Sequence, residues 1–190
     1  MSLPHILNSE AGRNHYDPYH NNLFEVYFTL PTALQEKYHQ DCALITEHVQ
    51  SISGLDGLTR GPEAITQKFM GTTRTYLAPK LGDTSFEISV TLSLNLRNGV
   101  DNYIFKLFRD WNKLGYDLET GETRLKSEYI ADWLKISIGN RKGDIIREVI
   151  FKDIILADGF TGLDELSYDN NDALTISLKF KSDWAQELVA

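Results

Sequence analysis

The most regular feature of the sequence is a strict alternation of apolar and polar side chains over residues 85–94. Its apolar members are Phe86, Ile88, Val90, Leu92 and Leu94. The positions between them hold one glutamate and small hydroxyl side chains. A period of two residues predicts a β-strand with one buried face and one face in water.

Other β-prone stretches lie on both sides of this strand. They cover residues 22–30, 43–52, 131–138, 144–152, 154–160 and 174–180. Pro31 ends the first stretch, and a short helix with Thr32 as its N-cap is expected over residues 32–39. Residues 139–143 contain two glycines and predict the turn of a hairpin.

One amphipathic helix is predicted from about Asp101 to Tyr116. Its apolar stripe, at the i, i+3, i+4, i+7 spacing of a helix, consists of Ile104, Leu107, Phe108, Trp111 and Leu114. Asn98 or Asp101 is the expected cap at its start, and Gly115 is expected to end it. Roughly six to eight strands around one helix predict a mainly β fold, a β-sandwich or barrel with the helix covering an open side or end.

Residues 57–84 depart from this pattern. Glycine, proline and threonine are frequent there, and only residues 65–70 and 74–77 are prone to form strands. A loop this long inside a compact domain is usually either functional or disordered. We therefore expect an extended hairpin arm over about residues 56–84. This arm would leave a single domain that spans residues 22–190, with residues 1–21 as a separate N-terminal arm.

Composition narrows the possible partners. The chain has 190 residues, with 19 Lys and Arg against 27 Asp and Glu, and a net charge of -8. Tight binding to a nucleic acid backbone needs clustered cations, and the sequence has no run of them. No apolar run approaches the roughly 20 residues that cross a bilayer, and the first 20 residues lack the features of a secretory signal. We expect no sequence-specific nucleic acid binding, no membrane insertion and production in the cytoplasm.

The sequence contains no motif of known catalytic chemistry. The five histidines, all within the first 48 residues, have no established metal-ligand spacing; they are His5, His15, His20, His39 and His48. The acidic residues Asp164, Glu165, Asp169 and Asp172 lack the central glycine and closing glutamate of a calcium loop. Cys42 is the single cysteine and is interpreted as a buried small hydrophobe. We predict no catalytic residue, no metal site and no cofactor, so the chain is not expected to be an enzyme.

Several short motifs occur in a particular order along the chain. They are Asn22-Leu23-Phe24-Glu25-Val26-Tyr27-Phe28, Ser51-Ile52-Ser53-Gly54-Leu55, the alternating strand from Phe86 to Leu94, Arg109-Asp110-Trp111, a Gly162-to-Asp172 stretch rich in Asp and Asn, and Ser182-Asp183-Trp184. In this order the sequence resembles the tail tube proteins of contractile-tailed phages. Their fold is shared with the inner tubes of type VI secretion and related contractile injection systems.

The resemblance implies a structural virion protein of the viral tail tube. Six copies would form a ring, and stacked rings would form a conduit for DNA into the host. The implied partners are further copies of the chain, sheath and baseplate proteins, and DNA in transit; assembly would take place in the bacterial cytoplasm. By position, the residues that would contact a neighbouring ring or subunit are Asp56, Arg60, Phe69, Met70, Arg74, Tyr76 and Leu77.

A further hypothesis concerns Glu87, which lies on the polar face of the most regular strand. If it lines the lumen, like-charge repulsion would let DNA slide without adhering. Three alternatives remain open from the sequence. The chain could be the inner tube of an injection system that carries proteins, or a baseplate protein that starts the tube. It could also be a monomeric β-sandwich that binds sugars or peptides, with Trp133 and Trp184 available for exposure.

Overall fold

The computed structural model describes residues 22–38, 45–59, 64–77, 85–162 and 173–189. The N-terminal arm, Cys42 and the acidic stretch after Gly162 lie outside these described residues. Six strands form one antiparallel sheet in the order β1-β6-β7-β8-β5-β2. Their bounds are β1 Phe24–Phe28, β2 Val49–Ser53, β5 Phe86–Ser93, β6 Ala131–Gly139, β7 Ile145–Thr161 and β8 Thr175–Val189. This mainly β architecture confirms the predicted fold class.

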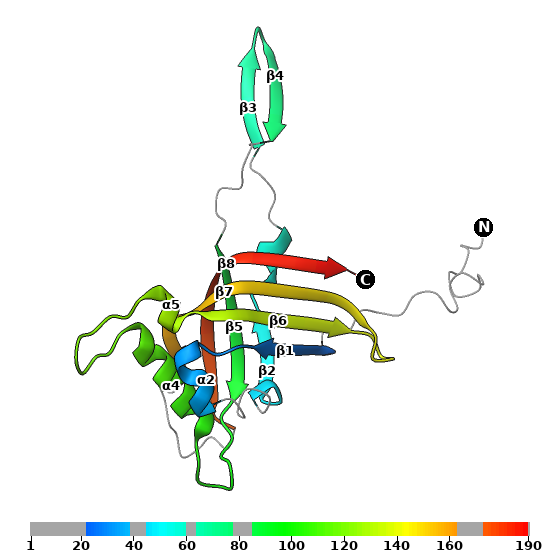
Figure 1. Cartoon of the computed structure of the whole chain (residues 1–190). Helices are drawn as coiled ribbons and strands as arrows, with labels where there is room; N and C mark the ends of the chain where they lie inside the picture. The colour runs from blue at the N-terminus through cyan, green and yellow to red at the C-terminus, as the bar shows by residue number, and fades with distance from the viewer. Residues whose placement is uncertain (1–21, 39–44, 60–63, 78–84, 163–172, 190) are drawn as a thin grey trace, which may run out of the picture.

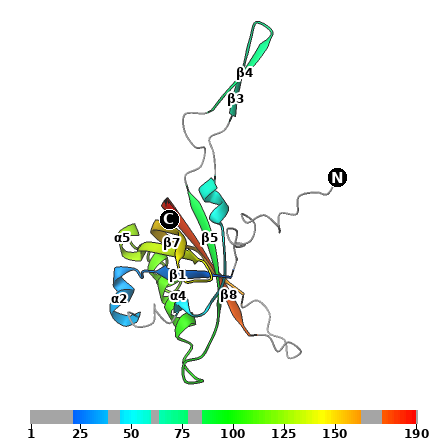
Figure 2. The same cartoon turned by 90° about the vertical axis from the view of Figure 1, so that its right-hand side faces the viewer.

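The sheet folds over itself into two layers because β7 and β8 are long enough to belong to both. In the first layer, the start of β7 lies between β6 and the end of β8, and β1 is the outermost strand. In the second layer, the start of β8 lies between the end of β7 and β5, and β2 is the outermost strand. Figure 1 shows the first layer crossing in front of the steeply inclined β5 and β2, and Figure 2 shows the two layers from the side.

Local backbone features produce the bend between the layers. Asp153 has a φ of 55°, and the β7–β8 register shifts between Ala157 and Phe160. Such bulges bend a strand without ending it. On β8, the Ser182 hydroxyl is buried and donates to the Lys152 carbonyl oxygen at 2.5 Å. A polar side chain thus connects the two strands at the bend.

The structure corrects four predicted strands. Residues 144–152 and 154–160 were expected as two strands, but Asp153 bends one continuous β7. The last strand was expected to end at Phe180 and instead continues to Val189, because its second half pairs with the start of β7. The strand expected from residue 43 begins only at Val49; Ile45 is helical and His48 lies in a turn.

Helix α4 (Tyr103–Gly115) closes the open end between the two layers, and its predicted apolar stripe is buried. Trp111 stacks on Phe108 at 6.1 Å between ring centres and also contacts the rings of Phe28 and Phe180. Its indole N–H donates to the carbonyl oxygen of Tyr129, in the short helix α5 (Lys126–Tyr129), at 3.0 Å. One aromatic side chain therefore joins α4 to both layers and to α5.

The helix starts differ slightly from those expected. Asn102, not Asn98 or Asp101, caps α4 by accepting from the Phe105 N–H, because Asp101 pairs with Arg97 in a β-bridge. In α2 (Thr32–Tyr38), Thr32 is the first helical residue. The Pro31 carbonyl oxygen accepts from the Leu34 and Gln35 N–H groups. The cap position therefore belongs to Pro31, and the expected cap at Thr32 was wrong.

Helix α2 is attached to α4 through Asp110. Its carboxylate accepts hydrogen bonds from Lys37 and from the Tyr38 hydroxyl, both at 2.7 Å. Burial raises the pKa of the Asp110 carboxyl, but these two hydrogen bonds outweigh burial and hold the pKa below its ordinary value. The Tyr38 ring is buried, whereas Lys37 remains largely exposed to water.

We expect Asp110→Asn to lower the free energy of unfolding by about 1 kcal/mol at neutral pH, because exposure of Lys37 weakens the ion pair. The folded pKa is depressed, so this stabilisation is present above the unfolded pKa of about 3.9 and is lost as pH falls through the folded pKa. Denaturant unfolding across this range measures it. The control is Glu119→Gln, whose pair with Lys113 is exposed. A pH-independent difference between wild type and Asp110→Asn would contradict the assignment.

Gly54 lies where the chain leaves β2 and enters the 3₁₀ helix η2 (Leu55–Thr59). Its φ is +94°, and an added Cβ would overlap the Glu87 carbonyl oxygen on β5. Side chains are strained at such a φ, and a backbone neighbour cannot move aside as a side-chain tip can.

We therefore expect Gly54→Ala to destabilise the chain by about 3 kcal/mol or more. Gly99→Ala is the matched control, because Gly99 also has a positive φ but an added Cβ would meet no atom within 4 Å. It should cost about 1 kcal/mol. Thermal unfolding of both variants makes the comparison. Equal melting temperatures for the two would contradict the close approach of Gly54 to β5.

Candidate assembly surfaces

A two-stranded hairpin extends away from the sandwich. Strands β3 (Ala64–Phe69) and β4 (Thr72–Leu77) pair only with each other among the described strands. Met70 and Gly71 connect them with φ angles of 44° and 81°, the left-handed combination of a tight hairpin turn. Figure 1 shows the hairpin extending from the sandwich roughly along the direction of β5.

Apolar side chains on this hairpin are in water. Met70 is 98% exposed, Leu77 70%, Tyr76 49% and Ile65 44%. A lone two-stranded hairpin is marginally stable in water, and clustered exposed apolar side chains mark contact surfaces. The hairpin therefore has the properties of an element that another protein surface would cover.

The structure brings most of the predicted contact residues to this hairpin. Met70, Arg74, Tyr76 and Leu77 are exposed on it, and Phe69 is the last residue of β3. Asp56 lies in η2, at the base of the arm, and Arg60 lies outside the described residues. Their role as contacts stays a prediction.

Sequence reasoning did not include Ile65 among the exposed apolar residues of the hairpin. It pairs with Tyr76 across the hairpin. The alternation of the arm sequence could have indicated it, because cross-strand partners lie on the same face.

A second feature is the number of free strand edges. Among the described residues, β1 has no partner on its outer side in the first layer, and residues 183–189 of β8 extend beyond β5. In the second layer, β2 likewise has no described partner on its outer side, and residues 155–161 of β7 extend beyond β6. Free N–H and C=O groups on such edges are ready to pair with another chain unless they are shielded.

The outer face of the first layer, which we call the aromatic face, presents Tyr27, Trp133, Ile150, Trp184 and Leu188. Trp133 pairs with Lys152, which in turn pairs with Trp184. The Lys152 ammonium lies 4.8 Å from the centre of the Trp184 ring. Both tryptophans are more than a third exposed. This face, in front in Figure 1, combines aromatic groups with two lysines, Lys135 and Lys152, and two glutamates, Glu25 and Glu148.

The outer face of the second layer, which we call the hydroxyl face, is different. Its register places these small side chains together: Ser51, Ser53, Ser89, Thr91, Ser93, Thr175 and Ser177. Its apolar members among the described strands are Ile155 and Ala157, which are half-buried at the β7 margin. The two outer faces of one sandwich thus differ sharply in chemistry.

Glu87 lies on the hydroxyl face and is exposed, as its strand pattern predicted. Its carboxylate, however, is 3.1 Å from the Lys181 ammonium on the neighbouring strand. Lys179 also lies on this face. The described part of the face therefore carries two cations for one anion, so Glu87 does not by itself make the surface acidic. Whether Glu87 faces a lumen stays a prediction.

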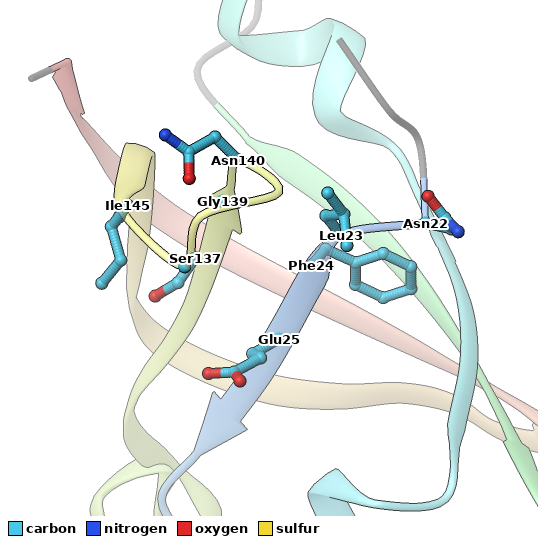
Figure 3. Close-up of a pocket in the computed structure, with 9 residues that line it drawn as sticks. Asn22, Leu23, Phe24, Glu25, Ser137, Gly139, Asn140 and Ile145 are labelled. Carbon is cyan, nitrogen blue, oxygen red and sulfur yellow. The ribbon is translucent and has the colours of Figure 1, made fainter.

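Two hollows are open at the surface. The first, of about 270 Å³, lies between the start of β1 and the β6–β7 turn (Figure 3). Its one charged lining side chain is Glu25, which accepts from the Tyr27 hydroxyl at 2.5 Å. The second, of about 370 Å³, lies between the end of α4 and β7 and is lined by Trp111, Tyr116 and Asp158, among others. The residues lining these hollows do not form a nucleophile–base pair.

Within the described ranges, no group of three or more His, Cys, Asp or Glu side chains is placed to hold a metal ion. His48 is 2.8 Å from the Asn95 amide nitrogen, and its ring lies against Tyr103. The other four histidines and the acidic residues 164–172 fall outside the described residues. None of the described helices is long and apolar enough to span a membrane.

Comparison with known proteins gives no family model and no curated protein that matches the sequence. Chains of solved structures, 23 in all, do match, and three of them illustrate the likeness of the fold. A chain of the PVC extracellular contractile injection system, in its sheath–tube complex, has 14% identity and a TM-score of 0.60, and the match covers 96% of this chain and 99% of that one. The cap that terminates the anti-feeding prophage tube has 12% identity, a TM-score of 0.58 and coverage of 92% and 93%.

The baseplate of the anti-feeding prophage also contains a similar chain, with 11% identity, a TM-score of 0.55 and coverage of 92% and 97%. At these identities the likeness concerns the fold. The matches extend over nearly the whole of each chain, so the likeness is not confined to a shared sandwich core. The chain therefore has the tail-tube-type fold that its sequence motifs implied.

Proposed function

We propose that the chain is a structural subunit of a tail-tube-type conduit, built from copies of itself that join into rings and stack. The observation that carries this proposal is the set of free strand edges in two crossed layers. Edges of the second layer would join neighbours around a ring. Edges of the first layer, together with the hairpin, would join one ring to the next.

The even number of strand segments in each layer supports ring closure. Each layer contains four strand segments in antiparallel order. Neighbouring segments alternate in direction, so the first and the last of the four second-layer segments, β7 and β2, run in opposite directions. When a rotation places the next copy beside β2, the β7 segment of that copy therefore lies antiparallel to β2. Every copy then meets its neighbours in the same way, and a rotation that closes gives a ring. Six copies per ring is the number that the resemblance implies.

The directions of the elements support one choice of tube axis in the proposed assembly. Figures 1 and 2 show the hairpin extending roughly along β5 and across the first layer. If the second-layer strands lie parallel to the tube axis, the second layers of neighbouring copies would meet side by side around the ring. The strands of the first layer would then run around the circumference, with the β8 edge facing one neighbouring ring and β1 the other.

The hairpin is long enough to cross such a boundary. Each of its strands has six residues, which span about 20 Å. Its exposed apolar side chains, Met70, Leu77 and Tyr76, would be covered by the adjacent ring. A non-enzymatic role agrees with the structural nature of the matched assemblies.

The chemistry of the cargo separates two settings for this conduit. In a phage, the tube would belong to the virion tail, assemble in the bacterial cytoplasm and pass DNA. One matched chain belongs instead to an extracellular contractile injection system, which favours an injection-system tube as the second candidate. Both settings supply sheath and baseplate proteins as partners, and in neither does the tube bind DNA by sequence.

Negative-stain electron microscopy and size-exclusion chromatography of the purified full chain test the proposal. We expect rings at low concentration and hollow tubes as the concentration rises. Because the hairpin would join rings, the double variant Met70→Asp, Leu77→Asp should give rings that no longer stack. The matched control is Val100→Asp, Leu118→Asp, at two exposed apolar positions outside the hairpin. A wild-type chain that stays monomeric at every concentration would contradict self-assembly.

A further inference from the structure

We infer that neighbouring copies in a ring are also joined by a charged head-to-tail contact, in which the β6–β7 turn of one copy meets the loop between α4 and α5 of the next. We call residues 140–144 the basic turn and residues 116–125 the acidic loop. This inference rests on the proposed function and adds to it a second contact beside the β2–β7 edge pairing. The positions of the two segments and their opposite charges support it.

The two segments lie at opposite ends of the first layer. In Figure 1 the acidic loop projects at the left, beyond α4 and α5, and the basic turn projects at the right, where β6 passes into β7. Within the second layer, β2 lies on the side toward the basic turn. The acidic loop borders the second-layer part of β7, because Leu118 lines the same hollow as Asp158 and Gly159. The rotation that sets β7 of one copy beside β2 of another therefore also brings an acidic loop toward a basic turn.

The acidic loop carries more anions than cations. Its charged residues are Asp117, Glu119, Glu122 and Arg124, which give a net charge of -2. Glu119 contacts Lys113 of α4 at 3.3 Å, but its side chain remains 79% exposed. Glu122 is exposed and makes no ion pair within the described ranges. Two carboxylates of the loop are thus in water and can meet a cationic partner.

Backbone hydrogen bonds hold the acidic loop in one shape. Tyr116 and Thr123 form a β-bridge across its base. The Asp117 N–H donates to the Glu122 carbonyl oxygen at 3.0 Å, and the Gly121 N–H donates to the Asp117 carbonyl oxygen at 2.7 Å. Ordering a loop on binding costs free energy, so a loop that is already ordered binds a partner more readily.

The basic turn presents two cations. Arg141 and Lys142 are exposed, and neither makes an ion pair in the part of the chain that the structure describes. The Asn140 side-chain oxygen orders the turn by accepting from the Lys142 and Asp144 N–H groups, at 2.8 and 2.9 Å. The anion of the turn, Asp144, accepts from the Asn140 side-chain nitrogen at 3.0 Å. The two cations are therefore available to anions of another copy.

This pair of surfaces gives the contact a direction. Opposite charges attract across an interface and fix its register, whereas like charges that face each other are costly. Two basic turns repel each other, and so do two acidic loops, so these ends disfavour a two-fold pair of copies. Each copy offers its turn to one neighbour and its loop to the other. Such a head-to-tail contact repeats until the rotation closes the ring.

Charge reversal on either side tests the inference. The turn variant is Arg141→Glu, Lys142→Glu, and the loop variant is Glu119→Lys, Glu122→Lys. In each variant alone, like charges face each other at every contact. The concentration at which half of the chain is in rings should therefore rise about tenfold or more. Size-exclusion chromatography over a dilution series measures this concentration.

A mixture of the two variants separates this contact from a general effect on folding. The acidic turn of the turn variant then meets the basic loop of the loop variant, and the two unchanged segments also attract each other. Rings should form again, and native mass spectrometry should find both variants in equal numbers. The matched control mixes the turn variant with wild type. The turn variant should stay outside the wild-type rings, because its acidic turn still faces an acidic loop.

Rings of either variant at the wild-type concentration would overturn the inference. So would a mixture that stays unassembled although both variants unfold at the wild-type temperature. A wild-type chain that forms no rings would instead defeat the proposed function, and the inference with it. The Leu118→Asp control for the hairpin only adds an anion to the acidic loop, so it does not oppose this contact.

If a charge reversal prevents folding, the neutral variant Arg141→Gln, Lys142→Gln takes its place. Salt screens exposed charges, so rings of the wild type should need a higher protein concentration as the salt concentration rises. Rings of the neutral variant should be much less sensitive to salt. The same salt dependence in both proteins would overturn the inference.

Discussion

Pairing between β7 and β8 is the interaction on which the rest of the structure depends. The ladder runs from Arg147 opposite Val189 to Thr161 opposite Ser177, and it passes through both layers. Asp153 and the buried Ser182 hydroxyl bend it without breaking it. Because two strands serve both layers, the layers cross, and the end between them is open for α4 to fill with Trp111 and Phe108.

Crossed layers also determine what the molecule can do with its surface. Each layer ends in free edges, and the edges of the two layers point in different directions. One fold can therefore make contacts around a ring and along an axis without using the same surface twice. In the proposed assembly, the hairpin would reinforce the axial direction, and the two outer faces would meet different surroundings. These features agree with a subunit that occurs in many copies in a larger assembly, and the matched chains come from tube assemblies.

Sequence patterns predicted those elements in which the order of apolar and polar side chains follows directly from which face is buried. The alternation in β5, the apolar stripe of α4 and the glycine-rich turn after β6 were confirmed. The continuity of β7 through Asp153 could not be predicted, because a left-handed aspartate has the same sequence signature as a turn. The pairing of Glu87 with Lys181 could not be predicted from the sequence for another reason. The two residues lie far apart in the chain, and only the strand register brings them together.

Amide hydrogen exchange compared among monomers, rings and tubes tests the central claim, that free strand edges join the copies. Edge amides exchange quickly when they are exposed and slowly when they pair with another strand. The account predicts that residues 49–53 of β2 become protected when rings form. Residues 183–189 of β8 should become protected only when rings stack into tubes. If β2 exchanges at the same rate in rings as in monomers, the rings are held by other surfaces and the account is wrong.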